Sequence, residues 1–382
     1  MKSIRRDYLP FGRPDFTDRE IDAVTRVMRS GWVGMGPEVI AFEEELSRYI
    51  GASQVVTVNS CTSALFLALL ISGVKEGDEV ICPSLTWCAT ANAALYLGAK
   101  VVFCDIDPQT LCVEQESLMR CLTPRTRAVM VVHFGGRTVD VMALRKLLPE
   151  RVHIIEDAAH ALGATFSNGS KVGSSGNLTC FSFYANKNLS TAEGGAVALN
   201  HQEFADQLRS LRQNAMPNDA WKRFNHAHTA FLSVALTDLG YKMNYTDLQA
   251  CIGRVQLARF DTMQTHRRTL VDQCLSRLGN RFLWQTGIQE PSHARHLLCI
   301  QLDRDLKLSR NELLLALRQR NIGASIHYSP LHHMPLYGHL AAVALPNTDA
   351  VTSRILTLPI SAKMSMDDVN DVCDHVLELI EK

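Results

Sequence analysis

The feature that most constrains the fold is a repeated alternation of short apolar runs with segments of helical periodicity, between about residues 20 and 200. The apolar runs are nearly continuous, so both of their faces must be buried if they form strands. Strands of this kind, connected through helices, build parallel sheets that helices cover on both sides. The sequence therefore predicts an α/β fold with a mainly parallel central sheet.

The expected strands share this apolar character and lie at 54–60, 78–83, 100–107, 127–134, 152–158, 177–184 and 195–200. Helical periodicity marks the segments 18–31, 37–51, 62–73, 86–98, 115–122 and 141–149. We expect this large α/β domain to comprise residues 1–260, with residues 1–13 as an N-terminal arm. A long helix at 258–278 follows, after which the rhythm changes, so residues 261–382 are expected to form a smaller α+β domain. The segment 216–238 shows no clear pattern.

The composition narrows the class of protein. Hydrophobic residues make up 46% of the chain and charged residues 20%, as in ordinary globular proteins. The 39 basic and 39 acidic residues balance, which argues against binding to nucleic acid or to an anionic membrane. No apolar run reaches the roughly 18 residues of a membrane span, and the basic start lacks the apolar stretch of a signal peptide. The 11 cysteines show no CxxC spacing, so we expect reduced thiols, no metal site and a cytoplasmic location.

One lysine, Lys187, stands in the stretch SFYANKNLSTAEGG, between two apolar runs that are expected to be neighbouring strands. Such a lysine is either a surface residue or an amine held in a dry pocket. Burial lowers the pKa of a lysine because it disfavours the ammonium form, and the neutral amine is a nucleophile toward carbonyl groups. The position of Lys187 is therefore compatible with covalent catalysis.

Two further strand ends carry polar groups. In VNSCTSALFLAL the backbone N–H groups of Thr62 and Ser63 open a helix and offer a phosphate site, although an N-cap by Ser60 or Thr62 is the simpler explanation. In IIEDAAHA a buried strand ends at Asp157, whose carboxylate needs a cation, several donors or a helix start to cap. His160 either faces the same crevice or packs in the interior. No GxGxxG follows the first strand, which argues against a dinucleotide site.

Together these strand ends match the three anchors of pyridoxal 5'-phosphate (PLP): a phosphate site, a carboxylate for the pyridine nitrogen and a lysine for the aldehyde. Ligands of such sheets bind at the carboxyl ends of the strands, where these groups converge. A carboxylate at about 4 Å stabilises a pyridinium by on the order of 4 kcal/mol at an effective dielectric constant of about 20, or about three pKa units. Trp87, at another strand end, offers a flat apolar face for the ring.

The sequence resembles the DegT/StrS family of PLP-dependent sugar-nucleotide aminotransferases, which have the aspartate-aminotransferase fold (PLP fold type I). The similarity covers essentially the whole chain, in the motifs LPFGRPDF, SGWVGMGP, VNSCTSAL, PSLTWCATANAALYLGAKVVFCDID, IIEDAAHALGA, FSFYANKN, AEGG, GYKMNYTDLQACIG and IHYSPLH. Within the family, the forms PSLTW, EDAAHA and AEGG are similar to those of the branch that makes UDP-4-amino-4-deoxy-L-arabinose.

The resemblance implies roles for individual residues toward the cofactor. Lys187 matches the lysine that forms the Schiff base, Asp157 the partner of the pyridinium, and Trp87 the stacking aromatic residue. The positions that match phosphate contacts are Thr62, Ser63 and Ser182. His160 matches a residue beside the cofactor's phenolic oxygen, which is Gln in many members of the family and His in the arabinose branch.

Other implied roles concern the substrate and the partner subunit. Asn244 matches an asparagine that is donated to the phosphate of the neighbouring subunit, so the resemblance implies a homodimer with shared active sites. His327 matches a histidine near the sugar-binding mouth. Tyr184 lies on the substrate side, where the arabinose branch has His, so the identity of the sugar is not implied.

The expected reaction moves an amino group from L-glutamate to a keto-sugar nucleotide, for cell-surface polysaccharide, lipopolysaccharide or other amino-sugar biosynthesis. A 4-keto substrate linked to UDP or dTDP is favoured, with a 3-keto sugar as the alternative. A PLP-dependent sugar dehydratase is disfavoured because those enzymes replace the lysine by histidine, and Lys187 is intact. A non-catalytic PLP-binding regulator is disfavoured because the chain shows no DNA-binding segment or basic patch.

Overall fold

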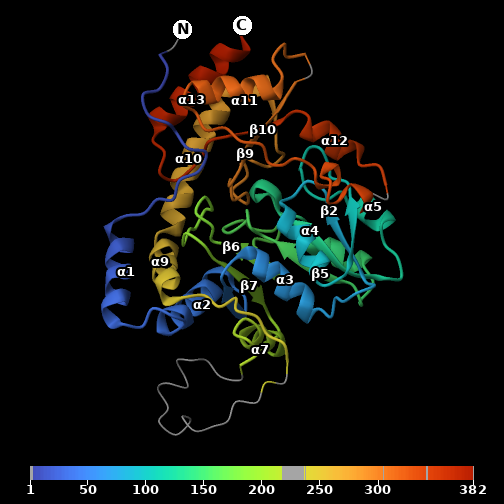
Figure 1. The fold of residues 1–382 in the computed structure, drawn as a ribbon. Coiled ribbons are helices and arrows are strands. Elements are labelled where there is room, and N and C mark those ends of the chain that lie inside the picture. The colour runs from blue at the N-terminus through green and yellow to red at the C-terminus, as the bar shows by residue number, and fades with distance from the viewer. Residues whose placement is uncertain (1–2, 217–235, 237, 304, 341–342, 382) are drawn as a thin grey trace.

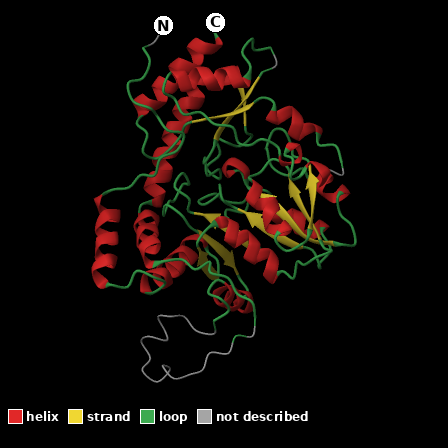
Figure 2. Ribbon diagram, in the orientation of Figure 1, coloured by secondary structure: helices red, strands yellow, loops and turns green. Residues whose placement is uncertain are grey.

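The structure, a computed structural model, describes residues 3–216, 236, 238–303, 305–340 and 343–381. Its framework is a seven-stranded sheet with the order β1-β7-β6-β5-β4-β2-β3 (Figures 1 and 2). The strands are β1 (Gln54–Val58), β2 (Glu79–Pro83), β3 (Lys100–Cys104), β4 (Thr126–Val132), β5 (His153–Asp157), β6 (Leu178–Ser182) and β7 (Gly195–Leu199). Each lies within an expected strand except β4, which starts one residue earlier, and the predicted α/β fold with a mainly parallel sheet is confirmed.

One strand runs against the others. β7 pairs antiparallel with both β1 and β6, whereas β2 through β6 pair with one another in parallel. The connection from β6 to β7, residues 183–194, contains no helix, so the chain turns back at the carboxyl end of β6. This turn carries Lys187, which is thereby held at the edge of the sheet where the parallel strands end.

Helices cover both faces of the sheet, as the apolar strands require. α2 (Pro37–Ile50), α5 (Gln115–Arg120) and α6 (Val141–Leu147) contribute to one core, and α3 (Cys61–Ile71), α4 (Cys88–Leu95) and α7 (Gln202–Leu211) to the other. Alternate residues of β4 enter opposite cores, with Val129 and Val131 in the first and Ala128 and Met130 in the second. The central strands are therefore buried on both sides.

A second, smaller core surrounds a three-stranded antiparallel sheet of order β10-β9-β8. Its elements are β8 (Phe282–Trp284), β9 (Leu298–Leu302), β10 (Ile355–Leu358), α11 (Arg310–Gln319) and α13 (Met366–Ile380). The long helix α10 (Phe260–Leu278) runs from the large part to the small one (Figure 1). Phe260 belongs to the large core and Leu270 to the small one.

The first part of the N-terminal arm packs on the smaller core. Leu9 is buried in that core and pairs with Ile322 in a single parallel bridge. The guanidinium of Arg5 contacts Asp368 and Asp371 of α13 at 2.7 Å each. Residues at both ends of the chain therefore meet, and both termini lie at the top of the view in Figure 1. The division of the chain at residue 260 remains a prediction.

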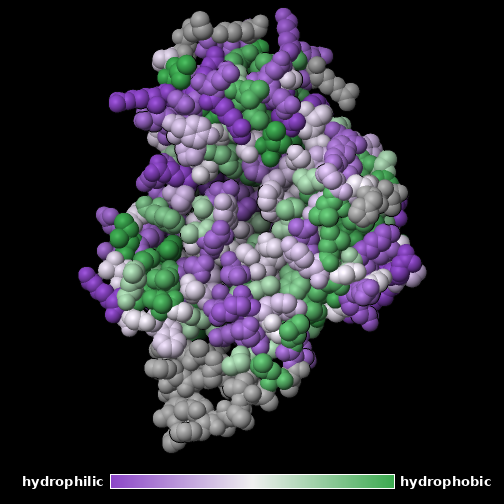
Figure 3. Space-filling view, viewed as in Figure 1, coloured by the Kyte–Doolittle hydropathy of each residue, from purple (hydrophilic) through white to green (hydrophobic). Residues whose placement is uncertain are grey.

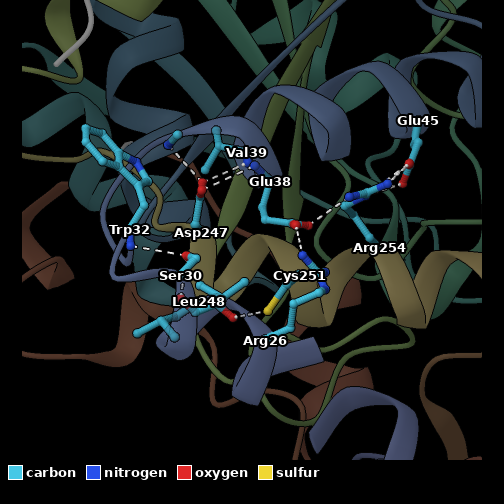
Figure 4. A network of polar contacts seen from close by, with 12 residues as sticks. Arg26, Ser30, Trp32, Glu38, Val39, Glu45, Asp247, Leu248, Cys251 and Arg254 are labelled. Carbon is cyan, nitrogen blue, oxygen red and sulfur yellow. Dashed lines mark hydrogen bonds and ion pairs between the residues drawn. The ribbon is translucent and has the colours of Figure 1, made fainter. Parts of the chain in front are cut away.

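A polar network joins the start of α2 to α9 (Asp247–Ala258), beside α1 (Asp18–Ser30) (Figure 4). The carboxylate of Asp247 accepts hydrogen bonds from the backbone N–H groups of Gly36 (2.8 Å), Glu38 (3.3 Å) and Val39 (3.0 Å). These donors are free at any helix N-terminus, so Asp247 caps α2 from a distant part of the sequence. The network fixes where the segment before α9, which contains Asn244, lies.

The remaining described elements are short, among them α12 (Pro346–Thr352) and the 3₁₀ turns η1 (Phe134–Gly136), η2 (Gly279–Arg281), η3 (Leu331–His333) and η4 (Gly338–Leu340). The segment 216–238, for which the sequence shows no pattern, lies mostly outside the described residues. Within the described part of the chain, every helix is too short or too polar to cross a membrane.

Candidate active site

A cavity of about 410 Å³ lies at the carboxyl edge of the large sheet. Its walls come from the ends of β4, β5 and β6, the start of α3, the segment before α4, the β6–β7 turn and residues 327–328 of the smaller part. The lining residues are Ser60, Cys61, Thr62, Leu65, Thr86, Trp87, Ala89, Val132, Asp157, Ala159, His160, Ser182, Tyr184, Asn186, Lys187, Glu193, Gly194, His327 and Tyr328. Eight of the ten predicted site residues are thus brought together.

Lys187 is the only lysine or arginine among the described residues that line this cavity. Its backbone N–H donates to the carbonyl oxygen of Tyr184 (2.9 Å). The turn is closed at Phe183, whose N–H donates to the carbonyl oxygen of Gly194 and whose carbonyl oxygen accepts from the N–H of Thr191. Burial lowers the pKa of Lys187 to about 8, against the opposing charge of Asp157. About a tenth of the amine is therefore neutral at pH 7, far more than for an ordinary lysine, and the neutral form is the one that acts as a nucleophile or base.

Asp157 ends β5 and is buried. Its carboxylate accepts hydrogen bonds from the hydroxyl of Thr90 (2.7 Å) and from the backbone N–H of Ala159 (3.2 Å), and it forms no ion pair with a described residue. Burial raises the pKa of Asp157, although these donors and the charge of Lys187 oppose the rise. The site thus holds an anion that a cationic ligand would stabilise.

His160 and Tyr328 form a pair on one wall of the cavity. The Nδ1 atom of His160 accepts a hydrogen bond from the backbone N–H of Gly135 (3.4 Å), so its proton is on Nε2. Nε2 lies 3.1 Å from the hydroxyl oxygen of Tyr328 and donates to it. Burial keeps the pKa of His160 well below its usual value and raises that of Tyr328. Tyr328 therefore keeps its own proton, which is free to donate into the cavity.

Two aromatic side chains form the open side of the cavity. Trp87 is 59% exposed and its ring lies 5.8 Å from that of Tyr328, tilted by 48°. Tyr184 is 47% exposed and belongs to the same lining. Exposed aromatic rings at the mouth of a cavity are suited to stack on a flat ligand, since leaving them in water is otherwise unfavourable. Both positions agree with the roles that the resemblance implies, without testing them.

The start of α3 reaches the cavity, but one predicted residue does not. The helix begins at Cys61, and the Ser60 hydroxyl caps it by accepting from the N–H of Ser63 (3.1 Å). The Ser63 hydroxyl donates to the side-chain oxygen of Asn59 (2.6 Å), so Ser63 faces away from the cavity and Thr62 lines it. A Cβ on Gly195 would lie 2.5 Å from the carbonyl carbon of Ser60, so β7 starts directly against this helix end.

Ser182 and His327 also line the cavity. The Ser182 hydroxyl accepts only a long bond from the N–H of Tyr184 (3.4 Å), which leaves its proton for a ligand. His327 contacts the hydroxyl of Thr357 through Nδ1 at 3.0 Å, and its ring lies 4.8 Å from that of Phe11 in the N-terminal arm. Burial lowers the pKa of His327 to about 3, so this imidazole is neutral.

Asn244 lies outside the cavity of its own chain. Its side-chain NH₂ donates to the carbonyl oxygen of Tyr245 (3.2 Å), and the side chain is partly exposed. The hydroxyl of Tyr245 donates to Thr191 of the Lys187 turn, which ties this segment to the site from behind. The predicted contribution of Asn244 to a neighbouring subunit is compatible with this position and remains a prediction.

Comparison with known proteins adds the decisive observation. Residues 14–377 match the DegT/DnrJ/EryC1/StrS aminotransferase family. The chain belongs to this family. It is 40% identical to the spore coat polysaccharide biosynthesis protein SpsC of Bacillus subtilis, over 100% of this chain and 99% of that protein.

Solved structures of aminotransferases superpose on almost the whole chain. Spr1654 of Streptococcus pneumoniae, an assigned sugar aminotransferase solved in its PLP form, matches with a TM-score of 0.90 and 28% identity, over 98% of this chain and 99% of that one. PseC of Helicobacter pylori, an aminotransferase in pseudoaminic acid biosynthesis, matches with a TM-score of 0.90 and 25% identity, over 98% and 100%. The predicted family, the aminotransferase fold, the PLP cofactor and the transaminase class are thereby confirmed.

The residues of this DegT-family site fit PLP. The uncompensated carboxylate of Asp157 would hold a pyridinium, the Lys187 amine would hold the aldehyde, and the start of α3 with Ser182 would hold the phosphate. When bound, the cofactor supplies an electron sink that labilises the α-proton of an amino acid. The buried Oδ1 atom of Asn186, which has no hydrogen-bond partner among the described residues, offers an additional acceptor to a ligand.

Several lining residues were not predicted as site residues. Tyr328 directly follows His327 in the motif IHYSPLH, yet no periodicity or charge distinguishes it in the sequence. Thr90, which binds Asp157, lies one helical turn after Trp87, and that spacing is the only signal that places it on the same side. Asn186 immediately precedes Lys187 and looks like any polar turn residue.

Proposed function

We propose that this enzyme transfers the amino group of L-glutamate to a keto-sugar nucleotide. The observation that carries the proposal is the joint placement of Lys187 and Asp157 on one cavity at the strand ends of a DegT-family aminotransferase. Its relatives point to sugars as acceptors, since SpsC is named for spore coat polysaccharide biosynthesis and PseC for pseudoaminic acid biosynthesis. A role in the synthesis of a cell-surface or other amino sugar follows, in the cytoplasm.

The proposed work of the protein side chains is proton transfer and positioning. The Nζ atom of Lys187, with a pKa of about 8, accepts the α-proton of glutamate and later returns a proton to the sugar carbon that receives the amine. The Tyr328 hydroxyl, which receives the His160 Nε2–H, donates its own proton to an oxygen in the cavity.

We favour a 4-keto sugar linked to UDP or dTDP over a 3-keto sugar. The support is the similarity of PSLTW and EDAAHA to the arabinose branch, including His160, which lines the cavity. Glutamine at the same position would offer similar hydrogen bonds, so His160 alone carries little information on the carbon that is aminated. Tyr184 at the mouth leaves the identity of the sugar open.

The test is a panel of 3-keto and 4-keto sugar nucleotides, each incubated with the holoenzyme and ¹⁵N-labelled glutamate. The proposal predicts that a 4-keto substrate yields a product with ¹⁵N on C4, seen by NMR of the purified sugar nucleotide. Amination of 3-keto substrates alone would refute the preference and leave the transaminase class intact. Labelling of neither series would refute the keto-sugar acceptor.

The less favoured functions give a different result in a simpler experiment. A dehydratase or a non-catalytic regulator would not exchange its cofactor's amino group with glutamate. The proposal predicts that glutamate alone bleaches the visible absorbance of bound PLP and releases one equivalent of 2-oxoglutarate per site. A stable spectrum with no 2-oxoglutarate would favour the alternatives.

We further propose that the active enzyme is a homodimer whose subunits complete each other's site. One cation, Lys187, lines the cavity within the described part of the chain, and the α3 start supplies few free donors once Ser60 has capped it. A phosphate needs more donors than these, and Asn244, which lies outside its own cavity, would supply one to the partner subunit.

A further inference from the structure

Two histidines and an aspartate converge on a surface site away from the active-site cavity. His332 and His333 end the turn η3, and Asp349 lies on α12. The Nε2 atoms of both histidines lie 3.0 Å from the same carboxylate oxygen, Oδ1 of Asp349. All three candidate ligand atoms lie within 4.8 Å of one another. The sequence analysis expected no metal site, because the cysteines show no CxxC spacing, and it did not consider these three residues.

The two elements that carry these residues are anchored to adjacent strands of the large sheet. His332 donates its backbone N–H to the buried Ser84 hydroxyl (3.2 Å), just after β2. The start of α12 is held by Asp105, just after β3, whose carboxylate accepts from the N–H groups of Asn347 (2.9 Å) and Thr348 (2.8 Å). β2 and β3 pair in parallel, so the framework fixes the separation of His332 and Asp349.

One tautomer of His332 leaves a lone pair for a cation, whereas in the other Nε2–H donates to Oδ1 of Asp349 (3.0 Å). The Ser84 hydroxyl oxygen lies 2.7 Å from Nδ1 of His332 and is able to accept its N–H. In that tautomer the Nε2 lone pair faces the carboxylate of Asp349, and the two repel unless a proton or a metal ion lies between them. Proteins usually orient a histidine ligand by a hydrogen-bond acceptor on its outer N–H, and the Ser84 hydroxyl oxygen is able to play that part here.

We propose that His332, His333 and Asp349 form a binding site for a divalent transition metal ion, with Zn²⁺ as the expected occupant. Metal–ligand bonds of about 2.0 to 2.1 Å at tetrahedral angles separate ligand atoms by about 3.3 Å, close to the 3.0 Å between the imidazoles and the carboxylate. Two imidazoles and one carboxylate suit zinc better than magnesium or calcium, which prefer oxygen ligands. His333 is 56% and Asp349 46% exposed, so the fourth position is open to water.

A metal at this site would join η3 to α12. The segment that leads into η3 carries Tyr328 of the active-site wall, and Leu331 donates its N–H to the Ser84 carbonyl (3.1 Å). Ser84 in turn lies three residues before Trp87, whose ring is 5.8 Å from that of Tyr328. The proposed ion would therefore hold η3 and α12 together, close in the chain to Tyr328 and, through Ser84, to Trp87. Its role is structural.

The test is a zinc titration of the purified holoenzyme by isothermal calorimetry, comparing wild type with His333→Ala, Asp349→Asn and the control His201→Ala. His201 is exposed and lies at the start of α7, outside the site. We expect one zinc per chain in wild type and in His201→Ala, and binding at least tenfold weaker in the other two variants. Both altered side chains are largely exposed, so these variants should fold.

A second measurement separates this site from the cysteines. Cobalt(II) bound here should give visible ligand-field bands without the sulfur-to-metal charge-transfer band of a thiolate site. The inference is overturned if wild type shows no saturable zinc binding, if Asp349→Asn and His333→Ala bind zinc as wild type does, or if the cobalt spectrum shows thiolate ligands. None of these outcomes bears on the proposed transamination.

Discussion

At the scale of single residues, the buried carboxylate of Asp157 makes the sharpest demand on a ligand. Asp157→Asn keeps the shape of the side chain, its oxygen still accepts from Ala159, and its new NH₂ is able to donate to Thr90. Since burial raises the pKa of Asp157, the variant should fold at least as stably as wild type without the cofactor. The cofactor, however, loses its counter-charge.

We therefore expect Asp157→Asn to bind PLP weakly and to slow the reaction with glutamate by on the order of 10³-fold. The measurements are cofactor affinity by absorbance titration, single-turnover rates with glutamate, and thermal unfolding of the apoenzyme. A rate near that of wild type would mean that the carboxylate only caps the backbone after β5.

Lys187 should impose a pH dependence on cofactor uptake. Burial lowers its pKa from 10.5 to about 8, and only the neutral amine is able to condense with an aldehyde. As the pH falls below about 8 the ammonium form accumulates, so the rate of PLP uptake by the apoenzyme should fall, by about tenfold per pH unit well below the pKa. Above about 8 the rate should level off. Stopped-flow absorbance measures this profile, and a rate that still rises steadily toward pH 10 would show that Lys187 is not shifted.

At the scale of secondary-structure elements, the sequence predicts best what periodicity controls. The seven strands of the large sheet and the helix α10 were expected, as were Lys187 and Asp157 at strand ends. The antiparallel direction of β7 was not, because direction depends on how the connection closes rather than on the apolar run itself. β8 and β10 are too short to show alternation, and α12 is a single short helix with few apolar residues.

In the candidate site, too, some features follow from the sequence pattern and others depend on the folded structure. The helix α3 starts at Cys61, one residue before the expected start at Thr62, and the Ser63 hydroxyl donates to Asn59; the contact of Ser63 with phosphate remains a prediction. Element boundaries are the least certain part of a sequence-based prediction, and a shift of one residue on a helix rotates a side chain by about 100°. Tyr328 was missed because it comes from the smaller part of the chain, and only the folded structure brings it to the cavity.

The capping of α2 by Asp247 is an element-scale feature that can be tested by stability (Figure 4). Asp247→Ala leaves three backbone N–H groups at the start of α2 without their acceptor. We expect a loss of about 2 kcal/mol in the free energy of unfolding, measured by urea denaturation. Asp247→Asn should lose less, because its oxygen is able to replace Oδ1 toward Gly36 and Val39. A change below about 0.5 kcal/mol in the alanine variant would contradict the assignment of the cap.

At the scale of the whole molecule, several large apolar side chains are exposed on and between α1 and α2. Figure 3 shows hydrophobic side chains gathered on the left of the view, over α1 and α9. The exposed residues include Ile21 (61%), Met28 (63%), Val33 (43%) and Ile40 (39%). Asp247, which caps the start of α2, ties the segment of Asn244 to the same region. An apolar surface beside Asn244 is where a partner subunit is expected to dock.

A complementation experiment tests the shared site. Asn244→Ala and Lys187→Ala should each be nearly inactive, the first through weak cofactor retention and the second through loss of the amine. In a heterodimer of the two, one site carries both changes and the other carries neither. Mixing the variants with verified subunit exchange should therefore restore up to about half of the activity per heterodimer. Exchange without any recovery would show that each site is built from a single chain.

The most direct test of the central claim is to find which lysine holds the cofactor. Borohydride reduction of the holoenzyme fixes PLP covalently to that lysine, and mass spectrometry of the digest locates it. The account predicts a single modified site at Lys187, the lysine that lines the cavity, and a Lys187→Ala variant that folds but neither retains the label nor transfers an amino group. Label at another lysine, or continued amino transfer by Lys187→Ala, would contradict it.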